Sequence, residues 1–168
     1  MLVFLSLLGA AVLAVADQLI KGMVVLYVKP QGSMTVIEGL LTWVYSENTG
    51  AAFGMMSDSR WFFIVITAVM MLACLYLLFT KYRNSPVAAF IFALLLGGGV
   101  GNLIDRVANG FVVDYIYVSF FPAVFNFADC CVVVGAFLAI FALIYGDVRA
   151  ARAEKAQQAD EQNDTPNE

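Results

Sequence analysis

The stretch GGGVGNLIDRVANGFVVDYIYVSFFPAVFNFAD, residues 97–129, places three acidic residues in or beside strongly apolar sequence. They are Asp105, Asp114 and Asp129. A carboxylate at the edge of hydrocarbon costs roughly 3 kcal/mol on insertion scales, so an acidic residue there indicates a functional site. The stretch therefore predicts both a membrane location and a site.

Two amides share this stretch with the acids in a repeated pattern. Asn-x-x-Asp occurs at Asn102–Asp105 and again at Asn126–Asp129. On a helix this spacing places each amide beside its acid on one face. An amide can donate a hydrogen bond to a carboxylate, or accept one from a carboxylic acid, without bringing charge into the membrane.

The composition indicates an integral membrane protein. Of the 168 residues, 62% are hydrophobic and 13% are charged, whereas soluble domains have about one quarter charged residues. The formal charge of −4 comes largely from the C-terminal residues, and no basic patch suggests nucleic acid binding. There is no histidine, which excludes a Ser-His-Asp triad and His-ligated zinc. The three cysteines form neither a CxxC motif nor a disulfide framework, and no cofactor or metal site is expected.

Hydrophobic runs predict an all-α membrane protein with four transmembrane helices. The first run ends near Lys21, and the others cover residues 61–80, 87–104 and 126–145. Residues 1–146 form one membrane domain, and residues 147–168 form a polar tail that is disordered beyond a few helical turns. Ala14-Val15-Ala16 resembles a signal-peptide cleavage site, but no Lys or Arg precedes the apolar run.

The longest segment outside the helices, residues 22–60, predicts a small β-sheet and an interfacial segment over one mouth of the bundle. Residues 35–45 are rich in Val, Ile, Thr, Trp and Tyr, with a break at Glu38-Gly39. Gly50 lies in a run of small residues that lets the backbone approach another group closely. Met55 and Met56, together with the start of the next helix, favour a membrane surface. Residues 111–125 are read as an aromatic-rich connection.

Four spans place both termini on one side of the membrane. That side carries five cationic residues in the short loop at 81–83 and in the tail, against four on the other side. The density of positive charge favours cytoplasmic termini, although Lys21 beside the first span argues the other way. This topology gathers Asp17, the 22–60 segment and the three acids of the 97–129 stretch at the outer face.

The acids differ in their surroundings. Asp17 and Lys21 are four residues apart, which fits a helix-end ion pair with the lysine reaching headgroups, or a pair that shapes a pocket. Asp105 precedes Arg106, so an ion pair there or close by would keep it charged. Two acids that face each other in a dry site tend to share a proton, as in aspartic proteases. The residues favour Asp114 with Asp129 and give Asp105 a supporting role, and an exchange of Asp105 with Asp114 stays open.

Five motifs together resemble those of the bacterial lipoprotein signal peptidase family, signal peptidase II. Each motif alone is weak, but all occur in the family's order and cover most of the chain outside the second span and tail. They are Asp17-Gln18-Leu19-Ile20-Lys21, Asn48-Thr49-Gly50-Ala51-Ala52-Phe53, Gly101-Asn102-Leu103-Ile104-Asp105-Arg106, Val112-Val113-Asp114 and Phe125-Asn126-Phe127-Ala128-Asp129.

The resemblance implies a four-helix aspartic endopeptidase of the bacterial cytoplasmic (inner) membrane. It would remove the signal peptide of diacylglyceryl-modified prolipoproteins just before the lipidated cysteine, with its site near the extracytoplasmic face. The expected partners are these substrates, membrane lipid and globomycin-type inhibitors, and the expected state is a monomer. The catalytic pair carries over to Asp114 and Asp129. Residues that line or brace the pocket carry over to Asp17, Lys21, Asn48, Gly50, Asn102, Asp105, Arg106 and Asn126.

Two other classes remain as alternatives. A small proton-coupled transporter would use intramembrane acids as a relay, but it predicts acids spread through the depth of the bilayer. A structural membrane subunit would pair its acids with cations, and few cations lie near these acids in the sequence.

Overall fold

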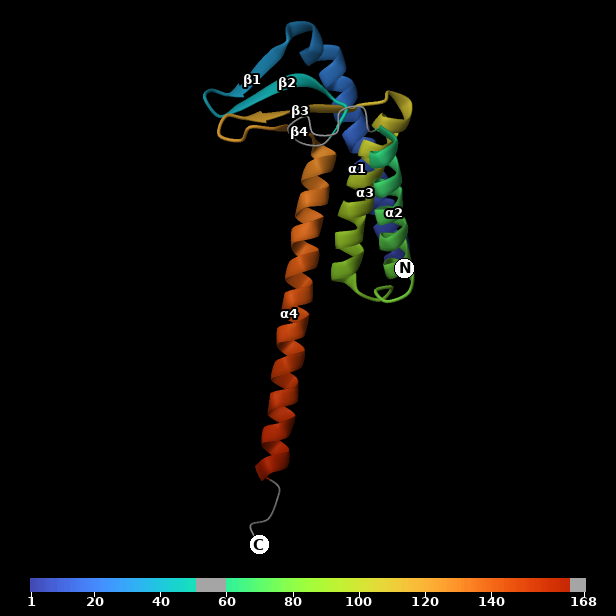
Figure 1. Ribbon diagram of the computed structural model, residues 1–168, viewed down its shortest axis with the longest axis vertical. Coiled ribbons are helices and arrows are strands. Elements are labelled where there is room, and N and C mark those ends of the chain that lie inside the picture. Colours follow the sequence, from blue (N-terminus) through green and yellow to red (C-terminus); the bar gives the residue numbers. More distant parts are fainter. Residues whose placement is uncertain (51–59, 164–168) are drawn as a thin grey trace.

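The computed structural model describes the backbone of residues 1–50 and 60–163 and the side chains of residues 1–50 and 60–146. Within these ranges, four helical segments are long and apolar enough to cross a membrane. They are Leu2–Gln31, Arg60–Phe79, Pro86–Ala108 and Phe127–Gly146. The predicted class, a four-helix membrane protein with a small sheet, is confirmed (Figure 1).

Helix boundaries follow the local sequence. Helix α1, Leu2–Met23, continues without a break into a π-helical turn, Val24–Val28, and a short 3₁₀ turn, Lys29–Gln31. Helix α2 covers Arg60–Phe79. Helix α3, Pro86–Ala108, starts where the Ser85 hydroxyl accepts the Ala88 N–H and proline occupies the first turn, because this position needs no backbone donor. Helix α4 covers Phe127–Asn163.

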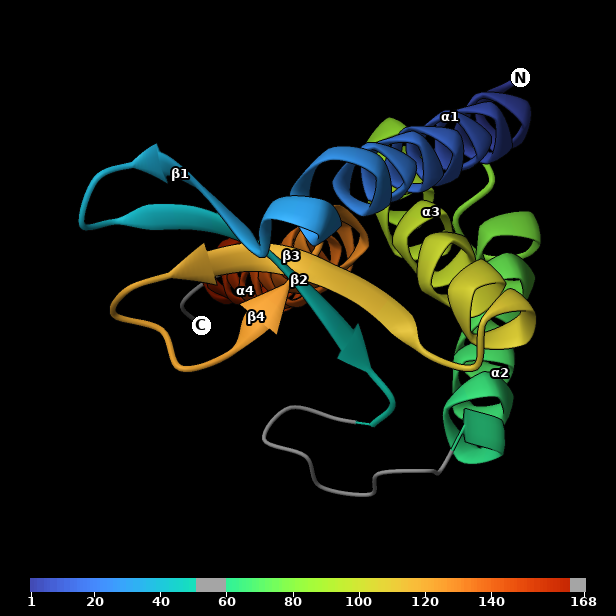
Figure 2. The same cartoon turned by 90° about the horizontal axis from the view of Figure 1, so that it is seen from above.

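Helix α3 lies at the centre of the bundle and packs against α1, α2 and α4 (Figure 2). Three consecutive glycines on α3, residues 97–99, allow close packing of helices on two sides. A Cβ at Gly97 would lie 2.9 Å from the backbone oxygen of Ala10 on α1, and one at Gly98 would collide with the Ala128 oxygen on α4. Most large apolar side chains on the other helices are exposed, as expected for surfaces that face lipid.

A four-stranded antiparallel sheet lies across the end of the bundle opposite the N-terminus (Figure 1). Its order is β1–β2–β3–β4, with β1 at Ser33–Ile37, β2 at Leu41–Asn48, β3 at Val112–Val118 and β4 at Val124–Phe125. The strands predicted around the Glu38-Gly39 break are present. The prediction of residues 111–125 as a connection is wrong, because β3 and β4 occupy it, and β3 places Asp114 opposite Ser46 of β2.

The C-terminal part differs from the predicted boundary. Helix α4 continues past Gly146 to Asn163 and projects beyond the other helices (Figure 1), whereas the sequence predicts a tail disordered beyond a few turns. Ala, Arg, Glu and Gln dominate residues 149–163, and these residues have high helix propensity. The interfacial segment predicted around Met55 and Met56 lies outside the described residues.

Candidate active site

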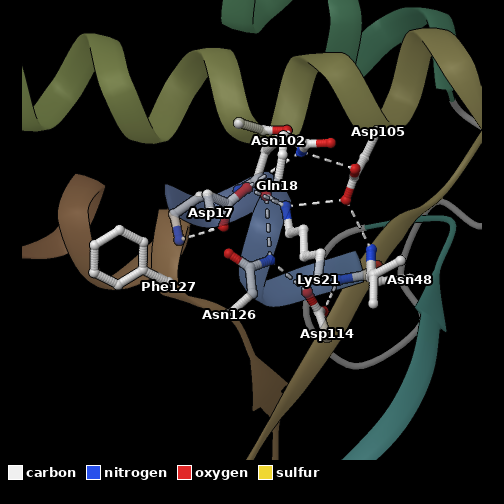
Figure 3. Close-up of polar contacts among 12 residues, drawn as sticks. Asp17, Gln18, Lys21, Asn48, Asn102, Asp105, Asp114, Asn126 and Phe127 are labelled. Atoms are coloured by element: carbon white, nitrogen blue, oxygen red, sulfur yellow. Dashed lines mark hydrogen bonds and ion pairs between the residues drawn. The ribbon is translucent and has the colours of Figure 1, made fainter. Parts of the chain in front are cut away.

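Polar side chains gather where the end of α1, the end of α3, strand β3 and the start of α4 meet beneath the sheet (Figure 3). Each of these side chains belongs to a strongly apolar stretch of sequence. Seven polar or charged residues are buried in the described part of the chain, and six of them belong to this cluster: Asp17, Lys21, Asn102, Asp105, Asp114 and Asn126. The convergence predicted from the sequence is therefore present.

Lys21 is the buried cation of this cluster. Its Nζ lies 2.8 Å from Asp17 Oδ2 and 2.9 Å from Asp105 Oδ2. The residue is only 3% exposed, so the interpretation that it reaches out to headgroups is wrong; Lys21 lies inside the buried polar cluster. The reason is that Asp105, from α3, supplies a second negative charge that a helix-end pair would lack.

Asp105 is held on both oxygens. Besides Lys21, Oδ2 accepts the Val113 N–H at 3.0 Å and Oδ1 accepts from Gln18 Nε2 at 3.1 Å. Arg106 is not its partner, because the Arg106 guanidinium lies 5.1 Å from the centre of the Phe63 ring and makes no ion pair among the described residues. Asp105 is thus occupied by a buried cation, a backbone donor and an amide, which fits a supporting role.

The start of α4 is capped from three directions. Asn126 Oδ1 accepts the Asp129 N–H at 2.9 Å, and Asp129 Oδ2 accepts the Asn126 N–H at 3.1 Å, which is a reciprocal capping arrangement. The Phe127 N–H donates to the Tyr115 hydroxyl at 3.2 Å, and the Ala128 N–H donates to Asp17 Oδ1 at 3.1 Å. These bonds place Asp129 in the first turn, where the helix dipole favours its charged form.

Asp114 and Asp129 are held by amides instead of by cations. Asn126 Nδ2 donates to Asp114 Oδ1 at 2.6 Å, while the Oδ1 and the backbone N–H of Asn126 bond to Asp129. Asn102 Nδ2 donates to Asp129 Oδ1 at 2.7 Å. Asn126 therefore joins the two acids directly, and no Lys or Arg lies within ion-pair distance of either acid among the described residues.

A third amide approaches Asp114 from β2. Asn48 Nδ2 donates to Asp114 Oδ2 at 2.8 Å. The Gly50 N–H donates to Asn48 Oδ1 at 3.0 Å, so the backbone at Gly50 fixes which end of the amide faces the acid. Asn48 and Gly50, which the resemblance assigns to the pocket, thus lie beside Asp114.

Groups that can only donate set the direction of the other two amides. The Lys21 ammonium lies 3.0 Å from Asn102 Oδ1, so the Asn102 nitrogen must face Asp129. Asn102 Oδ1 also accepts from Asn126 Nδ2 at 3.2 Å. Because Asn126 Oδ1 already accepts a backbone N–H, its nitrogen must face Asp114. Both acids thus receive hydrogen bonds of fixed direction.

Burial is the largest cause of the raised pKa of the Asp114 carboxyl. Its residue is 2% exposed, and burial raises the pKa of this carboxyl to about 6, with a further contribution from the negative charge of Asp129. The hydrogen bonds from Asn48 and Asn126 oppose that rise because they favour the charged form. Asp114 can therefore carry a proton near neutral pH, which an ordinary aspartic acid cannot do.

A cavity of about 360 Å³ opens beside Asp129 between α2, α3 and α4. Its lining is mostly apolar, from residues such as Ile66, Met70 and Val133. Asn102, Arg106 and Asp129 supply polar groups to it. The cavity can hold an apolar chain with a polar group presented to Asp129. Among the described side chains, residues 1–50 and 60–146, no group of three or more Cys, Asp or Glu is placed to hold a metal ion.

Two residues of the site were not predicted as site residues. Gln18 Nε2 reaches Asp105 Oδ1 and the Gly101 oxygen, and the Tyr115 hydroxyl accepts the first N–H of α4. Gln18 directly follows Asp17 in the motif at residues 17–21, and this position next to an acid could have indicated a role in the site. Tyr115 had no such signal, because its contact depends on the strand that the sequence reading missed.

Comparison with known proteins gives a consistent result. The family model described as signal peptidase (SPase) II matches residues 9–145. The lipoprotein signal peptidase of Caldanaerobacter subterraneus subsp. tengcongensis is 45% identical over 134 residues, 79% of this chain and 92% of that protein. That of Symbiobacterium thermophilum is 38% identical over 144 residues, 83% of this chain and 94% of that protein.

A solved structure described as a bacterial membrane enzyme superposes with a TM-score of 0.75 at 30% sequence identity. The superposition covers 97% of this chain and 93% of the other. The likeness thus extends over the whole fold, including the sheet and the four helices. On the match of residues 9–145 and on relatives of this similarity, the chain belongs to the signal peptidase II family.

Proposed function

We propose that this chain is an aspartic endopeptidase that removes the signal peptide from diacylglyceryl-modified prolipoproteins just before the lipidated cysteine. Membership of the family makes the chain a lipoprotein signal peptidase and hence a protease. One observation carries the assignment of the catalytic pair. Asp17 and Asp105 are both ion-paired with Lys21, whereas Asp114 and Asp129 are joined through Asn126 without a cation.

The two acids have different surroundings and therefore different roles. Asp114, whose pKa is raised to about 6, carries the proton and donates it to the scissile carbonyl oxygen. Asp129, at the N-terminus of α4, is the carboxylate that takes a proton from the attacking water. Attack gives a gem-diol. Asp129, now protonated, gives its proton to the amide nitrogen while the Asp114 carboxylate takes one from a gem-diol hydroxyl, and the C–N bond breaks to leave a carboxylic acid and an amine without a covalent intermediate. The fixed amides keep both carboxylates in place during these transfers.

The cavity beside Asp129 fits a substrate that stays in the membrane. Its apolar walls suit the hydrophobic signal peptide, which arrives laterally between α2 and α4. The Asn102 amide and the Arg106 guanidinium at this cavity can receive the polar backbone of the peptide, because an unpaired peptide group near hydrocarbon is costly. Globomycin-type cyclic peptides would occupy the same space, and neither role requires more than one copy of the chain.

The cationic loop at 81–83 and the tail argue for cytoplasmic termini in the bacterial inner membrane. The sheet and the acids lie at the opposite end of the bundle (Figure 1), so in this orientation the site lies near the extracytoplasmic face. A water-requiring reaction on a lipid-anchored substrate needs such a position, where acyl chains and water are both present.

The test is cleavage of a diacylated prolipoprotein by the purified enzyme and by Asp114→Asn and Asp129→Asn variants. Each substitution keeps the shape of the side chain but removes the group that exchanges a proton, so each should lower turnover by about 10⁴-fold or more. Asp105→Asn should cause a smaller, graded loss because Asp105 acts through Lys21 and Val113. Turnover is measured by mobility of the released lipoprotein.

Two comparisons make this test specific. The unlipidated form of the same prolipoprotein should not be cleaved, and its cleavage at an equal rate would contradict the substrate assignment. A dead Asp105→Asn enzyme beside a normal Asp114→Asn enzyme would show that the two acids have been exchanged.

A further inference from the structure

Tyr115 connects the two elements that carry the proposed catalytic acids. It follows Asp114 on β3, is 2% exposed, and its hydroxyl accepts the Phe127 N–H of α4 at 3.2 Å. Its ring meets the Trp43 ring edge-to-face, with centroids 6.2 Å apart. This hydroxyl has no role in the proposed proton transfers. A buried hydroxyl is costly unless a hydrogen bond offsets the free energy of its desolvation.

The first three N–H groups of α4 donate hydrogen bonds to acceptors in three different parts of the chain. Phe127 donates to Tyr115 on β3, Ala128 donates to Asp17 on α1, and Asp129 donates to its own cap, Asn126. The Tyr115 contact is the one of these three that joins the helical turn to the strand of Asp114. It adds to two other links between β3 and this end of α4: the pairing of Ile116 with Phe125 just before the helix, and the hydrogen bond from the Asn126 amide to Asp114.

The strand side of this contact is held firmly. Tyr115 packs with Val24, Val28 and Val113 in one buried cluster, to which Phe127 and Trp43 also contribute. Its neighbour Ile116 pairs with both Trp43 of β2 and Phe125 of β4. A planar side chain with two torsions, packed on all sides, has little freedom to move. A shift of the α4 start relative to β3 must therefore break or stretch the Tyr115–Phe127 hydrogen bond.

We propose that Tyr115 is a positioning residue, whose hydroxyl fixes the start of α4 against β3 and so sets the separation of Asp114 and Asp129. The proposal rests on the proposed function of those two acids. Tyr115 itself touches neither carboxylate in the structure, so it acts through the backbone of α4. Because a dyad shares a proton only at short separation, a loosened start of α4 weakens the transfer and leaves substrate binding in the cavity between α2, α3 and α4 intact.

The experiment compares Tyr115→Phe with Tyr117→Phe in the full chain. Tyr117 lies two residues along the same strand, is 37% exposed and makes no hydrogen bond with its hydroxyl among the described residues, so it controls for the substitution itself. In Tyr115→Phe, kcat should fall by about tenfold with KM within about twofold, which is less than the roughly 100-fold loss that a 1 Å misplacement can cause. Tyr117→Phe should match the wild type.

Two further measurements separate positioning from general stability. Hydrogen exchange at the Phe127 amide should accelerate by about tenfold in Tyr115→Phe alone, because its acceptor is gone. The basic limb of the kcat profile should move to lower pH, since a more distant Asp129 raises the affinity of Asp114 for a proton less. Asp17, Lys21, Asp105 and Arg106 also face this site, and neither substitution alters their charge.

The outcomes are distinct. Unchanged kcat in Tyr115→Phe, a loss confined to KM or to the melting temperature, or an equal loss in Tyr117→Phe would each overturn the proposal. A different result would be faster exchange at Phe127 in Tyr115→Phe together with a wild-type chain that cleaves no prolipoprotein. It would contradict the proposed function but support the contact between Tyr115 and α4.

Discussion

At the scale of residues, what distinguishes the four site acids is the charge of their partners. Asp17 and Asp105 face the Lys21 ammonium at 2.8 and 2.9 Å. Asp114 receives hydrogen bonds from Asn48 and Asn126, which favour its charged form less strongly than a buried cation would. A carboxyl with amide partners stays close to the protonation equilibrium that acid–base catalysis needs.

The pH dependence of cleavage should report this balance. Burial raises the pKa of Asp114 to about 6, and its proton is lost as the pH rises through that value. The free enzyme needs this proton, so kcat/KM should fall on the basic side. In Asn48→Ala a hydrogen bond that lowers the pKa of Asp114 is missing. The basic limb should then move to higher pH by up to about one unit, because such a bond contributes about 1.5 kcal/mol.

Glu47→Gln is the matched control for this profile. Glu47 precedes Asn48 on β2, but its side chain faces away from the site. There its Oε1 accepts a hydrogen bond from the Tyr45 hydroxyl at 2.6 Å. Its loss should leave the pH profile of kcat/KM where it was. A basic limb that moves to lower pH in Asn48→Ala would mean that Asn48 stabilises the neutral form of Asp114.

At the scale of elements, glycine on α3 decides how closely α4 can approach. A Cβ at Gly98 would collide with the Ala128 oxygen and lie 2.8 Å from Val132 Cγ2. Since the first of these is backbone, Gly98→Ala should push α4 away and cost about 1–3 kcal/mol of unfolding free energy. Turnover should fall as well, because α3 carries Asn102 and α4 carries Asp129. Thermal unfolding and kcat, both in detergent, measure the two effects.

Gly22→Ala, on α1, tests whether any glycine-to-alanine change would do the same. No atom lies within 4 Å of a Cβ built there. Alanine favours a helix over glycine by about 1 kcal/mol, so the melting temperature should stay or rise slightly. Normal stability and turnover in Gly98→Ala would show that α3 and α4 need not pack as closely as the structure has them.

The elements also show what the sequence could and could not predict. The spans were readable because an uncharged run of about twenty residues has few alternatives. Strand β3 was not recognised, since Val112–Val118 is apolar on both faces and lacks the alternation of a half-buried strand. Its first four residues, 112–115, are all buried. The contact of Tyr115 with α4 was invisible for the same reason.

The sequence predicted which residues belong to the polar cluster better than it predicted which of them bond to one another. Asn-x-x-Asp at 126–129 predicted an amide beside an acid, and the reciprocal cap confirms that placement. The same spacing at 102–105 was misleading about partners, because Asn102 donates to Asp129 and Asp105 pairs with Lys21. Local spacing fixes which residues share a helix face, whereas long-range packing decides which of them meet.

At the scale of the whole molecule, the fold separates two ends with different chemistry. The sheet and all six buried polar residues of the site lie at one end, and the loop between α2 and α3 lies at the other with the N-terminus (Figure 1). Glu38, in the turn between β1 and β2, and Arg83, in the α2–α3 loop, therefore mark opposite ends.

These two positions test the proposed orientation. In a chain whose three cysteines are replaced by alanine, Glu38→Cys and Arg83→Cys each add one thiol. The alanine replacements should leave turnover nearly intact, because among the described residues no cysteine side chain makes a hydrogen bond to a site acid. A membrane-impermeant maleimide should label Glu38→Cys in right-side-out vesicles and Arg83→Cys in inverted vesicles. The physical reason is that cations in the short loop hold it in the cytoplasm. The reverse labelling pattern would place the acids at the cytoplasmic face. Labelling of both positions from the same side would contradict the arrangement in which the sheet and the α2–α3 loop lie at opposite ends of the bundle.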